Sequence, residues 1–144
     1  MTVSASIDIP AAVTAELNAA TFSQSFTATR SYLPDFELPE MADLHVTVVP
    51  RGIIKTPLSR SALACDVQVD IGVQKKLPTG DNGEIDALLN LVEEIAEFFE
   101  QRHLTAIPGA VWVKTEHKPL YATDHLDELR QFTAVVTLTF RTTR

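Results

Sequence analysis

Glu116 and Lys118 are separated by one residue, which is the E-x-K spacing of one large class of metal-dependent nucleases. In such a site the carboxylate holds a divalent metal ion and the lysine orients the attacking water. The site also needs an acidic partner from a neighbouring strand, and Asp66 or Asp70 could supply it. Because the pattern is short and Pro119 follows it directly, the favoured interpretation is a solvated strand end.

The other reactive side chains give no stronger site. Asp66 and Asp70 share one face of a predicted strand but lie about 13 Å apart, at roughly 3.3 Å per residue, which is too far for a catalytic carboxylate pair. Cys65 falls on the apolar face of that strand, which favours a small buried side chain over a nucleophile. None of the histidines has zinc-ligand spacing: they are His45, His103, His117 and His125. We therefore expect no catalytic residue, no metal ion and no cofactor.

Two oppositely charged segments stand out in a chain whose net charge is −7. The segment 51–60 contains Arg51, Lys55 and Arg60 and no acidic residue, and its glycine and proline predict a loop. The polar face of the helix predicted at 84–103 carries the acidic set: Glu93, Glu94, Glu97 and Glu100. Such a face is usually only solvated, but it also suits contact with a neighbouring subunit. We predict that the two segments meet across a subunit interface.

The composition is that of an ordinary globular domain. The chain has 144 residues, 45% apolar and 22% charged, which fits one domain over residues 1–144 with its own core. Residues 1–8 are small and polar, and we expect them to be flexible. A single cysteine excludes an internal disulfide and suits a reducing compartment. We expect no signal peptide and no membrane span, and the negative charge argues against a general phosphate-binding surface.

Hydrophobic periodicity predicts several antiparallel strands. In the segment 61–75 apolar and polar side chains alternate, as in a strand with one face on the core and the other in water. Further elements are predicted from similar patterns and from turn residues: strands at 22–33, 44–49, 110–120 and 132–141, a proline-punctuated loop at 34–42, a polar turn at 124–129, and a short helix from Asp8 to Ala20. Trp112 is expected on the polar face of its strand.

The helix predicted at 84–103 is the clearest helical pattern. Asp81 followed by Glu84 resembles a capping box at its start. Its apolar stripe has the spacing i, i+3, i+4, i+7: Ile85, Leu88, Leu89, Val92, Ala96 and Phe99, widened by Ile95 and Phe98. These patterns predict the α+β class: a mostly antiparallel sheet with one long amphipathic helix packed on one face and a short N-terminal helix.

The order of these elements is one part of a resemblance to small phage and prophage neck and tail proteins, and the stretch YATDHLDELRQFTAVVTLTFR at 121–141 resembles their C-terminal end. The similarity is to the tail-terminator or tail-completion group. It covers roughly residues 63–141 and is carried by patterns of residue type, without invariant catalytic residues.

This resemblance implies a structural, non-enzymatic subunit that forms a homo-oligomeric ring, in solution or only on the tail tube. The ring ends the tail tube and joins it to head-completion or connector proteins, while DNA passes through without sequence-specific binding. The implied location is the virion neck, and the host cytoplasm during assembly. Two alternatives stay open: a metal-dependent nuclease that uses Glu116 and Lys118, and a host-encoded interaction module. The genes that flank this one would distinguish a phage structural subunit from a host-encoded interaction module.

Overall fold

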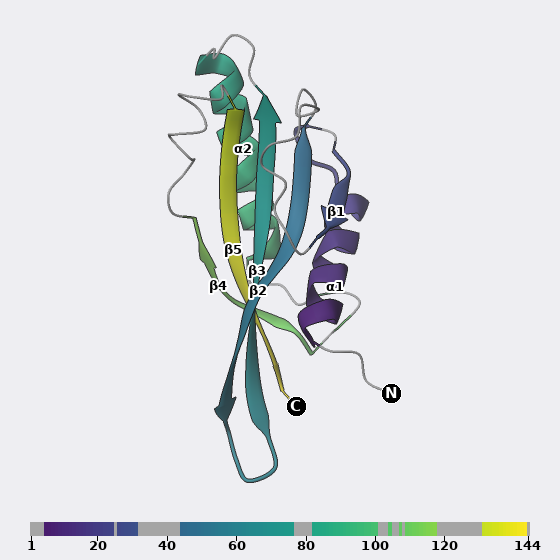
Figure 1. Cartoon of the computed structure of the whole chain (residues 1–144), viewed down its shortest axis with the longest axis vertical. Coiled ribbons are helices and arrows are strands. Elements are labelled where there is room, and N and C mark those ends of the chain that lie inside the picture. The colour runs from purple at the N-terminus through teal and green to yellow at the C-terminus, as the bar shows by residue number, and fades with distance from the viewer. Residues whose placement is uncertain are drawn as a thin grey trace.

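The computed structural model describes residues 5–24, 26–31, 44–76, 82–100, 104, 107, 109–117 and 131–143. Within these ranges two helices and five strands follow one another along the chain (Figure 1). Their order is α1 (Ala5–Ala19), β1 (Ala28–Arg30), β2 (His45–Pro57), β3 (Leu63–Lys76), α2 (Asn82–Phe99), β4 (Val111–Glu116) and β5 (Gln131–Thr143). The predicted α+β class, with one long helix and a shorter N-terminal one, is confirmed.

The strands form one sheet in the order β1-β2-β3-β5-β4. Only the short pair β1–β2 is parallel, and the other three pairs are antiparallel. β3 lies at the centre and pairs along nearly its whole length with β2 on one side and β5 on the other. This long three-stranded ladder is the frame on which every other element is placed.

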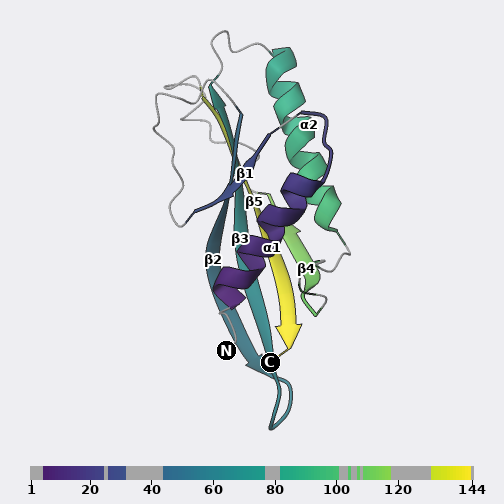
Figure 2. The ribbon, with the colours of Figure 1, turned by 90° about the vertical axis from the view of Figure 1, so that its right-hand side faces the viewer.

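Both helices pack on the same face of the sheet (Figure 2). α1 lies over β1 and β2, and α2 lies against β5. The predicted alternation of β3 and β5 is confirmed, because one face of both strands is fully buried in this core: Val67, Val69, Ile71 and Val73 from β3, and Phe132, Ala134, Val136, Leu138 and Phe140 from β5. Cys65 is buried, as expected.

The second face of the sheet is less wet than the alternation predicts. Thr133, Thr137 and Thr139 of β5 and Gln74 of β3 are all buried. The burial of Thr137 has a clear cause, because its short side chain is covered by the longer side chains of Asp70 and Arg51. Its hydroxyl donates to Asp70 Oδ1 (2.7 Å) and accepts from Arg51 Nη1 (3.1 Å).

The buried face of α2 was predicted only in part. The buried side chains of α2 are Leu88, Leu91, Val92, Ile95 and Phe99. Leu91 was left out of the predicted stripe, whereas Ile85, Leu89 and Ala96 were included and are only partly buried. Apolar residues cover so much of this helix that its sequence does not define the centre of the buried face. α2 also begins at Asn82, two residues earlier than predicted, and residues 101–103 lie outside the described ranges.

One strand prediction and one loop prediction were wrong. Among the described residues, the strand predicted at 22–33 is reduced to Ala28–Arg30, because Ser23 is held by Glu94 of α2 and the Ala28 amide by Asn18 of α1; residues 25, 32 and 33 lie outside the described ranges. The loop predicted at 51–60 is instead the second half of β2, which runs past Pro50 to Pro57. A bulge between Pro50 and Gly52 leaves Arg51 outside the ladder of strand pairs. Proline and glycine are both tolerated in a strand at such a bulge.

β4 contains a further bulge, between Trp112 and Lys114, and the predicted facing is wrong only before it: Thr115, after the bulge, pairs with Leu138 on the core side as predicted. Trp112 pairs with Phe140 and packs against the core, and its Nε1 donates to Thr115 Oγ1 (2.8 Å). Val111 and Val113 are exposed instead.

At the N-terminus α1 begins at Ala5, so residues 5–8 are helical where flexibility was predicted. The predictions for 34–42, 124–129, Asp81, His103, Lys118 and His125 fall outside the described residues.

Candidate subunit interface

The three basic residues of the predicted interface lie in the segment 51–63, here called the arm, which consists of the end of β2, a turn and the first residue of β3. Because β5 pairs with β3 as far as Ala64, the turn is the part that extends past all three strands. Figure 1 shows this arm projecting beyond the rest of the sheet. The turn is closed by main-chain hydrogen bonds from the Leu58 and Ser59 amides to the Ala62 carbonyl (3.0 and 3.3 Å). Pairing of Lys55 with Cys65 and of Pro57 with Leu63 continues the sheet to the end of the arm.

The bulge at Arg51 changes which arm residues share a face. Before it, Pro50 pairs with Val69, and after it Ile53 pairs with Val67, whose side chain points to the helices. Successive side chains of a strand alternate between faces, so one extra residue moves the following ones to the opposite side. Ile53 and Lys55 therefore lie on the helix-bearing side of the arm, and Ile54 lies on the other.

The arm combines exposed apolar side chains with positive charge. Four large apolar side chains are exposed there: Ile53 (37%), Ile54 (56%), Leu58 (59%) and Leu63 (39%). The same thirteen residues contain Arg51, Lys55 and Arg60 and no acidic residue, although the whole chain has a net charge of −7. A concentrated apolar surface bordered by charge is characteristic of an interaction site.

The three basic residues are not equivalent. Arg51 Nη1 lies 3.6 Å from Asp70 Oδ1 and donates to Thr137, so this side chain is bound to the sheet at the base of the arm. Lys55 and Arg60 form no ion pair within the described part of the chain. The charges that the arm can offer to a partner are therefore those of Lys55 and Arg60.

The acidic residues of the predicted interface also differ: Glu94 is bound within the subunit, whereas the other three are exposed. Glu94 Oε2 accepts hydrogen bonds from the main-chain amide (3.3 Å) and the hydroxyl of Ser23, which ties the segment after α1 to α2. Glu93, Glu97 and Glu100 are exposed along one line of the helix, at i, i+4 and i+7 spacing. Figures 1 and 2 place α2 on the body, away from the arm, so one chain does not bring the basic and acidic sets together.

The residues proposed for a nuclease are held by other side chains. Asp66 accepts two hydrogen bonds from Arg141, at 2.7 Å from Nε and 3.0 Å from Nη2. Glu116 lies 2.7 Å from Lys114 Nζ, and Asp70 accepts from Thr137. Among the described residues no three histidine, cysteine or acidic side chains are grouped as they would be to hold a metal ion.

Within the described part of the chain, the environment of Asp66 clearly changes the pKa of its carboxylate. Hydrogen bonds from Arg141 lower the pKa of Asp66 below its ordinary value of 3.8; partial burial opposes this shift, and the positive charges of Arg141 and Lys114 add to it. The hydrogen bonds and the nearby positive charges together keep the Asp66 carboxylate ionised and bound to Arg141. The pair therefore serves to join β3 to β5.

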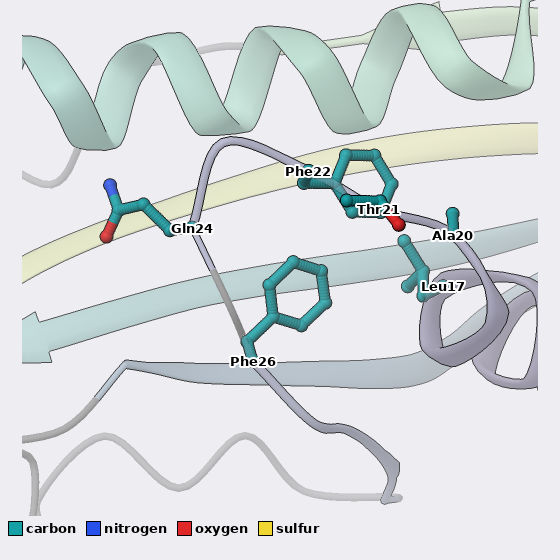
Figure 3. A pocket seen from close by; sticks show the side chains of 6 residues that line it. All are labelled: Leu17, Ala20, Thr21, Phe22, Gln24 and Phe26. Atoms are coloured by element: carbon teal, nitrogen blue, oxygen red, sulfur yellow. The ribbon is translucent and has the colours of Figure 1, made fainter.

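A small pocket, which the sequence did not reveal, lies where α1 ends. It has a volume of about 160 Å³ and is lined by the last turns of α1 and the connector, residues 20–27. Figure 3 shows the six lining side chains: Leu17, Ala20, Thr21, Phe22, Gln24 and Phe26. The rings of Phe22 and Phe26 stack with centroids 5.5 Å apart, and Phe22 also meets Phe98 of α2 edge-on at 5.5 Å.

Hydrogen bonds fix the walls of this pocket from both helices. Asn18 Nδ2 donates to the Ala28 carbonyl (3.0 Å), and the Ala28 amide donates to Asn18 Oδ1 (2.7 Å). Gln24 Nε2 donates to the Ala87 carbonyl of α2 (3.3 Å). The pocket is thus preformed and lies directly beside the acidic helix.

Neither helix in the described ranges has the length and apolar character that a bilayer crossing requires. No protein-family model matches the sequence, and no curated protein is significantly similar to it. The function must therefore be argued from the arm, the acidic helix and the pocket.

Proposed function

We propose that this chain is a structural subunit of a phage or prophage particle: a tail-terminator or neck protein. It forms a ring at the head-proximal end of the tail tube and acts through its surfaces without catalysis. The observation that carries this proposal is the arm, where four large apolar side chains are exposed beside Lys55 and Arg60, two cations that form no ion pair with any described residue. A projection of this composition is stable when a partner covers it.

The energetic roles of the two kinds of side chain differ. Burial of one leucine or isoleucine side chain contributes about 1.5–3 kcal/mol. An exposed ion pair contributes only about 0–1 kcal/mol. The apolar residues of the arm therefore supply most of the affinity, and its charges select the partner and set the register.

A ring requires two different surfaces on each subunit. A contact between unlike patches, repeated with a rotation that closes, produces a ring, whereas a contact between like patches stops at a dimer. The arm and the acidic side of α2 are such unlike patches, with opposite charge and separate positions on the chain. The overall negative charge also lets DNA pass through the ring without sticking to it.

The test is the location of the protein in the particle. A tagged copy expressed from its own locus, in the genome that encodes it, should co-purify with assembled particles and be found by electron microscopy at the neck. Deletion of the gene should leave unjoined heads and tails or tubes of uncontrolled length. Flanking terminase, portal or tape-measure genes are the expected setting.

A protein that is absent from purified particles, or whose deletion leaves particle assembly normal, would contradict this function. It would favour the host-encoded interaction module instead.

A further inference from the structure

We propose that the arm of one copy docks on the next copy of this chain with Leu58 inserted into the pocket formed by α1 and the connector. The inference rests on the assembly function proposed above and names the two surfaces that meet. It commits to a second copy of the same chain as the occupant of the pocket. Four observations support it: the chemistry of the tip, the chemistry of the pocket, their charges and their positions.

The tip of the arm is suited to insertion. Leu58 is the most exposed large apolar side chain of the described residues, at 59%. It begins a turn that is closed on itself by the hydrogen bonds to Ala62, so the tip is preorganised and little conformational entropy is lost when it binds. Arg60 lies two residues away in the same turn.

The pocket has room for one side chain from a neighbouring copy. Its volume of about 160 Å³ is far above the roughly 10–15 Å³ that a single water molecule requires. Leu17, Phe22 and Phe26 provide apolar walls, Thr21 and Gln24 add a larger polar part to the exposed lining, and Asn18, Gln24 and Glu94 hold the walls in place through the hydrogen bonds described above. An apolar side chain that enters finds the site already formed.

The charges around the two surfaces are complementary. Glu94 is hydrogen-bonded to the connector beside the pocket, and Glu97 follows it by three residues, on the same side of α2. A Leu58 side chain seated in the pocket brings Arg60 of the same turn toward this acidic side. Charges that border an apolar anchor orient it and exclude wrong partners.

The positions of the two surfaces exclude an interaction within one chain. The arm projects from one end of the sheet, while the connector runs along α2 on the body (Figures 1 and 2). One copy therefore cannot fill its own pocket, and each copy offers a free tip to one neighbour and a free pocket to another. This is the head-to-tail pattern that a ring needs.

Disulfide trapping tests the contact directly. Two full-length chains of different tag size, both carrying Cys65→Ala, are mixed at high concentration under mild oxidation. One carries Leu58→Cys at the tip and the other Thr21→Cys at the exposed rim of the pocket. The expected result is a covalent heterodimer. The matched control replaces Thr21→Cys by Lys114→Cys, an exposed position on the opposite face of the sheet, and should give none.

A second measurement uses the self-association of single variants. Leu58→Ser should weaken association roughly tenfold or more, the effect of losing one buried leucine. Val111→Ser removes another exposed apolar side chain, 49% exposed and outside the arm, and should leave association unchanged.

Equal trapping at Thr21 and Lys114, or unchanged association in Leu58→Ser, would overturn the contact while leaving the assembly function standing. Absence of any covalent dimer would overturn the contact too. The assembly function would then be decided by the particle experiment alone.

Discussion

At the scale of single residues, the pair Asp66–Arg141 is the best-defined electrostatic contact of the described chain. The two side chains meet through two hydrogen bonds in one row of the sheet, with Ile54 of the arm as the next neighbour of Asp66. A bidentate arginine–carboxylate pair fixes geometry more firmly than a single contact does. The pair therefore holds the start of β3 and the end of β5 together where the arm leaves the body.

The lowered pKa of Asp66 predicts how this pair contributes to stability as pH changes. The native state favours the ionised carboxylate, so the stabilisation is complete above the ordinary pKa of 3.8 and is lost as pH falls through the lowered native value. Arg141→Gln should therefore lower the melting temperature at neutral pH. The difference from wild type should shrink as the solution is acidified below the ordinary value. Melting curves between neutral and acidic pH measure this directly.

Asp66→Asn is the matched control for that experiment. It removes the titrating group, so adding Arg141→Gln to this variant should change the melting temperature by an amount that does not depend on pH. If Arg141→Gln destabilises equally at all pH values, the contribution of Arg141 is packing and the ion pair is not responsible.

At the scale of elements, α2 stabilises the fold through a contact line centred on Leu88, Leu91 and Val92. Leu91→Ala should lower the free energy of unfolding by roughly 2–5 kcal/mol, as truncation of a buried leucine does. Leu89→Ala removes the same atoms from a partly buried position and should cost clearly less. Urea unfolding of both variants measures the difference. Equal costs would mean that the buried face of α2 is not the one described.

The core of the fold could be predicted from the sequence, because its signal is local. Strict alternation in β3 and β5 fixes which side chains point inward, and every predicted apolar residue of β5 is buried. The arm could not be predicted in this way. Its proline and glycine are ordinary turn signals, and only pairing with β3 and the bulge at Arg51 keep the segment in the sheet.

The candidate interface could be predicted only in part for a similar reason. Counting charges identifies the basic and acidic sets, since charge is a property of composition. The partners that remove two members from these sets are distant in sequence: Arg51 and Thr137 are 86 residues apart, and Ser23 and Glu94 are 71 residues apart. The pocket was missed because Phe22 and Phe26 suggested a strand, whereas hydrogen bonds to both helices hold the connector outside the sheet.

At the scale of the whole molecule, the free charges of the two surfaces should control assembly. Changing Lys55 and Arg60 to glutamate should weaken ring or particle assembly, and so should changing Glu93, Glu97 and Glu100 to lysine. The two sets combined in one chain should partly restore it. Arg51 and Glu94 are left unchanged because they are bound within the subunit. Sedimentation and electron microscopy of assembled material provide the measurement.

Salt provides an independent check of the same contact. The distance over which exposed charges interact, the Debye length, falls to roughly 3 Å at 1 M ionic strength. Association of the wild type should therefore weaken as the salt concentration rises. The charge-reversed variants should respond less. Normal assembly of the triple lysine variant would mean that the acidic side of α2 is only solvated.

The projection of β2 has a consequence for solubility. Within the described ranges β1 covers only Val46–Val48, so the strand from 51 to 57 leaves main-chain donors and acceptors unpaired along its outer side. An unpaired strand edge is a template for uncontrolled stacking with other chains into aggregates. Three features of this edge oppose such stacking: the bulge at Arg51, the charge of Lys55 and the missing amide hydrogen of Pro57. These features protect the exposed strand from amyloid-like association with other chains.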